Sequence, residues 1–163
     1  MAIGFPGQGF GLDRCLVDSF VNEEASAEIP FGVAVKGGTN PENQCKLLTA
    51  ITDKLLGITV RSDSYQKGHE LGDTGLKPGV VCRVARKGEL LVTVEEAVTP
   101  ASRVYVRAVV AGAEVAGAFR DTTDASDLID VSAYCRFMGT TTGAGVVRLA
   151  FDFTMRGADF IAP

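Results

Sequence analysis

The chain has 163 residues, 46% of them hydrophobic, and its 16 basic and 20 acidic side chains give a formal net charge of −4. This composition indicates one domain with a real core and excludes a disordered chain. No run of five basic residues marks a nucleic-acid groove, and no apolar stretch reaches the ~20 residues that span a bilayer. The N-terminus lacks the basic-then-apolar order of a signal peptide. We therefore expect a soluble protein made in a cytoplasm, with no nucleic-acid or membrane partner.

The first thirty residues differ from the rest of the chain, because they sustain neither a helical nor a strand period. We interpret residues 1–30 as an extended N-terminal arm and residues 31–163 as a β domain with a short C-terminal tail. The arm carries three phenylalanines, and aromatic side chains often supply binding energy. We expect the arm to order on a neighbouring chain through Phe5, Phe10 and Phe20, and the β domain to fold without it.

Two short strings resemble sequences of the acyl-carrier-protein transacylases. FPGQG lies at residues 5–9, and GHELGD at residues 68–73 is similar to their nucleophile turn, GHSLGE. That chemistry needs a serine activated by a histidine. Here Glu70 occupies the serine position, and His69 is the sole histidine of the chain. We therefore predict no catalytic residue, two glycine turns, and an exposed His69.

From residue 31 onward, short apolar or alternating segments are separated by turn residues. They lie at residues 31–35, 57–61, 80–85, 89–95, 103–110 and 146–153. Period two in short segments, with 19 glycines and six prolines to supply turns, is typical of an antiparallel β-sandwich or barrel. We predict an all-β fold, a single β-sandwich or jelly-roll-like barrel, with a turn at Arg86-Lys87-Gly88 between two of its strands.

The alternation also predicts which side chains form the core. The inward faces are expected to contain Val92, Val94, Val104, Val106, Leu149 and Phe151. Arg103, Tyr105 and Arg107 are expected to face outward.

Residues 40–57 carry signals for two structures. Asn40 as an N-cap, Pro41 at the first position and Gly57 as a stop favour a helix. The segment Gln44–Leu47 alternates like a strand instead. These residues alone slightly favour the helix.

Two groups of side chains have residue types that bind metals, but their spacing does not fit a metal site. The four cysteines contain no C-x-x-C pair, and we expect them to be buried, reduced thiols. Four aspartates recur at every third position from Asp121 to Asp130, but calcium loops place ligands at every second position around a glycine. We interpret this run as a loop, and we expect neither a metal site nor a cofactor.

Four motifs occur in a definite order along most of the chain. They are GITVRS at residues 57–62, VARKGELLVTVEEAVTPASRVYVR at residues 84–107, GAFR at residues 117–120, and residues 133–153 at the end. In this order they resemble the tailed-bacteriophage capsid cement (decoration) proteins, over about Gly32 to Phe153. The resemblance also implies at most a short turn, rather than a helix, within residues 40–57.

The resemblance implies a structural virion protein that binds the outside of an icosahedral capsid and cements neighbouring major capsid subunits. Its expected partners are the major capsid protein and copies of itself, as a dimer or trimer. Its expected location is the capsid surface of the virion, after synthesis in the cytoplasm of a bacterial host. Phe5, Phe10 and Phe20 then become expected contacts to the capsid or to another copy. The alternative is a cytoplasmic small-molecule-binding β-barrel protein without catalysis.

Overall fold

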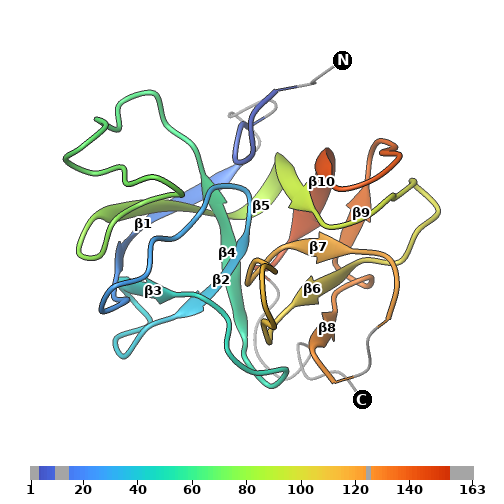
Figure 1. Ribbon diagram of the computed structural model, residues 1–163, viewed down its shortest axis with the longest axis horizontal. Coiled ribbons are helices and arrows are strands. Elements are labelled where there is room, and N and C mark those ends of the chain that lie inside the picture. The colour runs from blue at the N-terminus through green and yellow to red at the C-terminus, as the bar shows by residue number, and fades with distance from the viewer. Residues whose placement is uncertain (1–3, 10–14, 124–125, 155–163) are drawn as a thin grey trace.

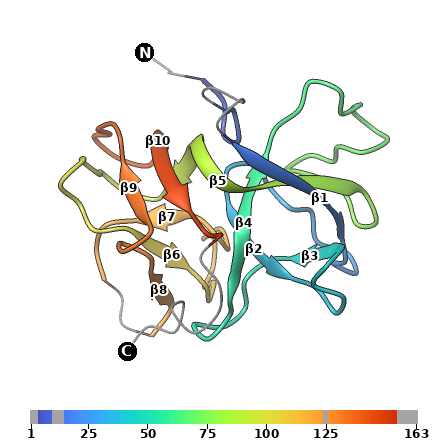
Figure 2. The same cartoon turned by 180° about the vertical axis from the view of Figure 1, so that it is seen from behind.

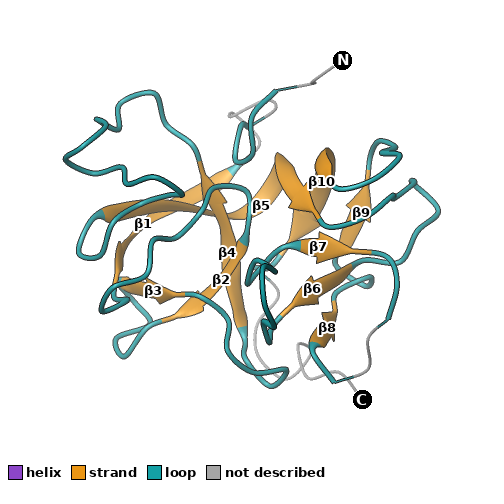
Figure 3. Cartoon of the chain, viewed as in Figure 1, coloured by secondary structure: helices purple, strands orange, loops and turns teal. Residues whose placement is uncertain are grey.

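The computed structural model describes residues 4–9, 15–123 and 126–154, and within these ranges the fold contains strands and loops but no helix (Figure 3). The all-β prediction is therefore confirmed. No helix in these ranges is long and apolar enough to cross a membrane. The strands are β1 (Leu16–Asn22), β2 (Ala34–Gly37), β3 (Gln44–Lys46), β4 (Leu55–Val60), β5 (Val81–Val94), β6 (Tyr105–Arg107), β7 (Phe119–Arg120), β8 (Leu128–Asp130), β9 (Cys135–Phe137) and β10 (Gly145–Asp152).

Five strands close into a barrel, which forms one lobe of the molecule (Figure 1). The order around the ring is β1-β3-β2-β4-β5, and antiparallel pairing of β1 with β5 closes it. The pairing of β1 with β3 is parallel. The expected sandwich or jelly roll is not confirmed, because a closed ring leaves no edge strands and needs no second facing sheet.

The second lobe is built on the C-terminal half of β5. β10 and then β9 pair along one side of it, and β7, β6 and β8 follow on the other side. The view from behind shows the same division, with β6 to β10 on one side of the molecule and β1 to β4 on the other (Figure 2). β5 is therefore the one strand that both lobes share.

The turn predicted at Arg86-Lys87-Gly88 is wrong, because these residues lie within the 14-residue strand β5. Gly88 has a φ of 137°, which favours glycine over other residues. Cys15 packs directly against Gly88, where a side chain would collide with it. The glycine therefore serves a close approach inside a continuous strand rather than a chain reversal.

Two apolar cores correspond to the two lobes. The barrel interior is filled by Phe20, Ile29, Val33, Val35, Cys45, Leu76, Cys82 and Val84. The larger core of the second lobe also takes side chains from the outer faces of β2 and β4, namely Ala34, Ile58 and Val60. All six residues predicted as a common core lie in this larger cluster, so that prediction is confirmed.

The expected separate arm is not confirmed. Residues 16–22 form β1, a barrel strand that pairs with both β3 and β5. The period-two signal in β1 is hidden because Asn22, 1% exposed, shares the inward face with Phe20. The side-chain amide of Asn22 donates hydrogen bonds to the carbonyl oxygens of Ala27 and Leu76, which satisfies its polar group inside the barrel.

The slight preference for a helix within residues 40–57 is wrong, because this segment forms β3 and the start of β4. The N–H groups of Asn43 and Gln44 donate to the carbonyl oxygen of Asn40, which closes one turn, and β3 begins at Gln44. Asn40 caps this turn by accepting from the Glu42 N–H. The helix-start signals therefore serve a single turn, as the resemblance implied.

Candidate interaction surfaces

The three phenylalanines predicted as contacts lie in different surroundings. Phe20 is 5% exposed inside the barrel, so its ring is not available to another chain. Phe10 lies outside the described residues. Phe5 is 62% exposed, more than any other large apolar side chain of the described part of the chain. Of the two rings within the described residues, Phe5 lies at the surface and Phe20 lies inside the barrel, so the structure does not bring these two together.

Phe5 lies on a turn whose backbone is hydrogen-bonded to β5 on one side and to Arg61, at the end of β4, on the other. The Gln8 N–H donates to the Phe5 carbonyl over 3.1 Å, which closes the turn. Gly7 then donates to the Leu91 carbonyl over 2.6 Å and accepts from the Arg61 N–H over 2.9 Å. Leu91 in turn donates to the Gln8 carbonyl over 2.9 Å. The string FPGQG is thus a glycine turn, as predicted, and it is fixed to the end of β4 and to β5.

Gly7 explains why the turn fits there. Its φ is 77°, and an added Cβ would lie 2.7 Å from the Arg61 nitrogen and 2.9 Å from the Thr59 carbonyl oxygen. Both neighbours are backbone atoms, so they cannot move aside cheaply. Pro6 precedes Gly7 and presets the backbone for a turn of this kind. The turn that carries Phe5 is therefore rigid.

Phe5 begins a stack of side chains that we call the aromatic column: Phe5, Arg61, Phe31 and Tyr65. The Arg61 guanidinium lies 4.6 Å from the centroid of the Phe5 ring and 6.0 Å from that of the Phe31 ring. The rings of Phe31 and Tyr65 stack at 5.8 Å with an interplanar angle of 29°. Distances of this size place the cation in attractive contact with the ring faces.

The hydroxyl of Tyr65 anchors the far end of the column to β5. It accepts a hydrogen bond from the Arg83 N–H over 3.1 Å and donates to the Val81 carbonyl over 3.0 Å. β4 ends opposite Arg83, so this hydroxyl continues the ladder where the strand stops. Val81 is 50% exposed beside it, and Arg83 is exposed as well.

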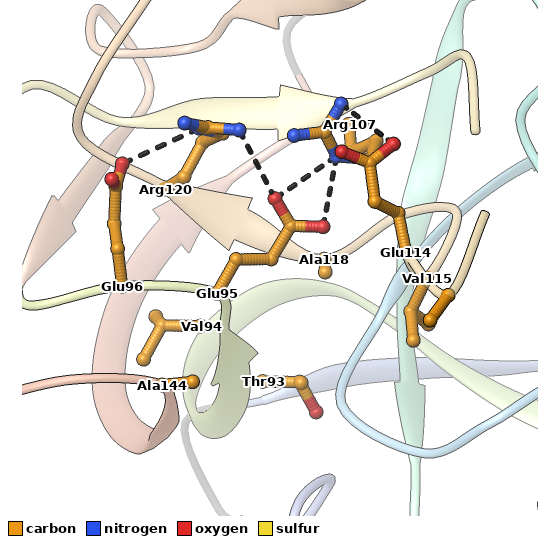
Figure 4. A pocket seen from close by; sticks show the side chains of 11 residues that line it. Thr93, Val94, Glu95, Glu96, Arg107, Glu114, Val115, Ala118, Arg120 and Ala144 are labelled. Carbon is orange, nitrogen blue, oxygen red and sulfur yellow. Dashed lines mark hydrogen bonds and ion pairs between the residues drawn. The ribbon is translucent and has the colours of Figure 1, made fainter. Parts of the chain in front are cut away.

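A second surface feature is a pocket of about 510 Å³ in the second lobe, which we call the arginine–glutamate pocket (Figure 4). Its charged side chains are Glu95, Glu96, Arg107, Glu114 and Arg120. The remaining lining is mostly small or apolar, including Val94, Val115, Ala118 and Ala144.

Arg107 is the centre of the charged network in this pocket. Its side chain is 1% exposed, so the prediction that it faces outward is wrong. Its Nε donates to the two carboxylate oxygens of Glu95 over 2.8 and 2.9 Å, and its Nη1 lies 3.2 Å from Glu114. Tyr105 was also predicted outward and is 6% exposed. Strands β7 and β8 pair with the two edges of β6, and Glu95 and Glu114 lie against the side chain of Arg107.

Arg120 links the rest of the network. Its Nη1 donates to Glu95 over 3.4 Å, and its Nε lies 3.3 Å from a carboxylate oxygen of Glu96. Burial disfavours the charged form of Glu96, but hydrogen bonds from the N–H and hydroxyl of Thr122 outweigh it and lower its pKa. The opposite charges pair with one another, although the buried Nε of Arg120 makes no hydrogen bond, and the ion pairs make this network a structural brace. The sequence offered no signal for it beyond the arginines of two strands.

The loop at residues 68–73 is a second turn, as predicted. His69 is exposed, as predicted, and the Gly68 N–H donates to the Leu71 carbonyl over 3.1 Å. Glu70, at the serine position of the resembling motif, accepts a hydrogen bond from the Gln66 N–H over 2.8 Å. The side chain of Glu70 therefore holds the loop together.

The acidic run is a loop only in part, because its last residues form β8 (Leu128–Asp130), and its carboxylates also hold neighbouring segments in place. Asp121 accepts hydrogen bonds from the Ser102 hydroxyl and the Arg103 N–H, and Asp130 pairs with the Arg103 guanidinium over 2.9 Å. Asp124 lies outside the described residues. Among the residues that the structure describes, no group of three or more potential metal-ligating side chains occurs.

Comparison with known proteins adds two findings. A family model described as "Structural cement protein (E217 gp24/Pam3 gp6)" matches residues 1–152. A solved chain from "The capsid of Myoviridae Phage XM1" has the same fold, with a TM-score of 0.68 and 21% sequence identity. That similarity covers 93% of this chain and 92% of the other. No curated protein sequence matches this chain.

Proposed function

This chain belongs to the phage structural cement protein family, and from that premise we propose that it binds the outside of an assembled icosahedral head and holds neighbouring major capsid subunits together. The observation that carries the proposal is the family match over residues 1–152, which includes both lobes. The fold that the chain shares with a chain of a phage capsid supports it further.

The shape of the molecule suits this role. A cement must transmit load between two subunits without deforming, which requires a stiff body. Here β5 runs through both lobes, and the barrel closes on itself. Because close-packed cores resist compression, two cores joined by one continuous strand form such a body.

The alternative of a small-molecule-binding barrel is not favoured. A binding barrel keeps a cavity inside its ring of strands. In this barrel the interior is filled by the side chains of Phe20, Ile29, Val33 and their neighbours. The family supports a structural role without catalysis, and it is the role we propose here.

The partners and location follow from the same proposal. The chain contacts the major capsid protein, and it also contacts copies of itself in a dimer or trimer. Its net charge of −4 favours neither nucleic acid nor an anionic membrane as a partner. It is made in the bacterial host cytoplasm and then occupies the surface of the capsid.

Of the contacts expected from the sequence, Phe5 remains our proposed anchor, because its ring is 62% exposed. Phe10 remains a proposed contact outside the described residues. We withdraw Phe20, because its ring fills the barrel.

The experiment uses phage heads assembled without this protein. Purified chain is added to such heads, and bound protein is measured by co-sedimentation and located by electron microscopy. We expect saturable binding in a fixed ratio to the major capsid protein, density on the outer surface across subunit seams, and greater resistance of the heads to heating. Absence of binding to these heads, with the protein folded, would overturn the proposed function.

A further inference from the structure

The exposure of Phe5 calls for an explanation that the fold of the single chain does not supply. The ring is 62% exposed on a turn with three backbone hydrogen bonds to the rest of the protein. A turn with this many hydrogen bonds could direct an apolar side chain into the core, but this turn directs Phe5 into solvent. Large exposed apolar groups on rigid mounts are characteristic of binding surfaces, because little entropy is lost when they become ordered by a partner.

Charged side chains lie at both ends of the aromatic column. The exposed Arg61 stacks against Phe5, and the exposed Arg83 lies at the Tyr65 end. Asp63 lies close to Phe5 and Arg61, and Glu70 lies close to Tyr65. Within the described residues neither Arg61 nor Arg83 forms an ion pair with these carboxylates, so both guanidinium groups are open to carboxylates of a partner.

We propose that the aromatic column is the docking surface for the major capsid protein, and that Phe5 enters an apolar socket whose rim carries carboxylates that pair with Arg61 and Arg83. This inference rests on the proposed function and names the chemistry of its contact. Aromatic and arginine side chains are enriched among the residues that dominate binding energy. The carboxylates on the partner are required because charge complementarity sets orientation at such a surface.

The same patch of a second copy does not fit this surface. In a two-fold dimer the same patch faces itself, so that Arg61 and Arg83 approach the same residues of the other copy. Like charges brought together in an interface oppose association. The occupant is therefore a different surface with the opposite charge.

The test compares single variants for binding to heads assembled without the native protein. Phe5→Ala removes an exposed ring, so the fold should be retained and its thermal transition unchanged. We expect the affinity for heads to fall about 30-fold. Ile51→Ala is the matched control, because Ile51 is 46% exposed and precedes β4, whereas Arg61 follows the other end of that strand. Its affinity should stay within a factor of about two of the unmodified chain.

A second pair of variants tests the charge. Arg61→Lys keeps the charge and loses the flat guanidinium that stacks on Phe5, and Arg61→Gln loses both. We expect both to weaken binding, and Arg61→Gln also to reduce the dependence of affinity on salt. Lys54→Gln, an exposed cation before β4, should leave both affinity and salt dependence unchanged.

The outcomes separate this inference from the proposed function. If the unmodified chain fails to bind heads, the proposed function falls. If the unmodified chain binds and Phe5→Ala binds equally well, the function stands and the aromatic column is not the contact. If Phe5→Ala changes the oligomeric state in solution and leaves head binding intact, the ring contacts another copy, and the inference is wrong.

Discussion

At the scale of the residue, the main departure from expectation is the burial of charge. Arg107 alternates with apolar neighbours and so was expected to face water, but its side chain is 1% exposed. Alternation places it on the face opposite Val106, and that face is covered by the 95–96 segment and by the loop that carries Glu114. The burial is tolerated because two carboxylates receive the guanidinium.

Replacing Arg107 tests this account. Arg107→Ala leaves Glu95 and Glu114 without their main counter-charge in a partly buried site, so we expect the free energy of unfolding to fall by about 3–5 kcal/mol. Arg103→Ala is the control. The side chain of Arg103 is 67% exposed, pairs with Asp130 and lies 5.7 Å from the centroid of the Tyr105 ring, so its loss should cost only about 1 kcal/mol. Urea denaturation of both variants measures the difference. Equal losses of unfolding free energy in the two variants would show that the buried ion pairs of Arg107 stabilise the fold no more than a surface pair does.

Asp152 provides a prediction on pH. Hydrogen bonds from Lys87 and Thr154 hold the pKa of Asp152 at about 2. In the unfolded chain this pKa is about 3.9, so the folded state is favoured wherever the carboxylate is ionised. The stabilisation is complete above about pH 4 and is lost as the pH falls through about 2. Because the side chain is 34% exposed, we expect no more than about 1 kcal/mol.

The measurement for Asp152 is a comparison of Asp152→Asn with the unmodified chain in urea at several pH values. The variant should be less stable at pH 7, and the difference should vanish as the pH approaches 2. A difference that stays constant with pH would show that the carboxylate is not the source.

At the scale of the element, β5 decides the architecture. Its first half closes the barrel with β1 and β4, and its second half carries β10 and β7. Arg86-Lys87-Gly88 has the composition of a turn, yet Lys87 pairs with both Leu16 and Asp152 inside the sheet. The pairing on both sides holds this segment extended, whatever its local preference for a turn.

Strand β1 gives a prediction that reverses the one drawn from sequence. Deleting residues 2–28 removes β1 and Phe20, which exposes the edges of β3 and β5 and opens the barrel core. We expect the truncated chain not to fold, as judged by loss of the cooperative thermal transition. Phe20→Ala, which keeps the strand, should fold with a loss of about 3–5 kcal/mol. A truncated chain with an unchanged thermal transition would show that residues 2–28 are a separable arm after all.

At the scale of the whole molecule, the two lobes are coupled by more than β5. The outer faces of β2 and β4 contribute Ala34, Ile58 and Val60 to the core of the second lobe. The Ala34 N–H also donates to the Gly117 carbonyl over 2.8 Å, which joins β2 to the loop before β7. Gly117 has a φ of 80° and no room for a side chain against Ala34, so this junction depends on glycine.

The shared strand β5, and the side chains that β2 and β4 contribute to the core of the second lobe, predict that the lobes unfold together. Phe151→Ala, in the second lobe, should cost about 3–5 kcal/mol because its ring is 5% exposed and packs against Phe153. We expect hydrogen exchange to accelerate equally for the most protected amides of β2, in the barrel, and of β10, in the second lobe. Faster exchange confined to β10 would show that the lobes are separate folding units.

The sequence by itself determined the fold class, the family and much of the core. The alternation in residues 89–95 and 146–153 predicted the buried faces of β5 and β10, because period two reports the direction of each side chain relative to its own strand. The ordered motifs indicated the cement family. The glycine turn at residues 5–9 was also predicted, but not the surface it serves.

The tertiary structure alone decided what lies opposite each of those faces. Leu16 pairs with Lys87 and Phe5 meets Arg61, and both contacts join parts of the chain that are more than fifty residues apart. Local preferences carry no information on such partners, because the pairing is set by the burial and hydrogen bonding of the whole domain. For this reason β1 was taken for an arm, β5 for two strands, and Arg107 for a surface residue.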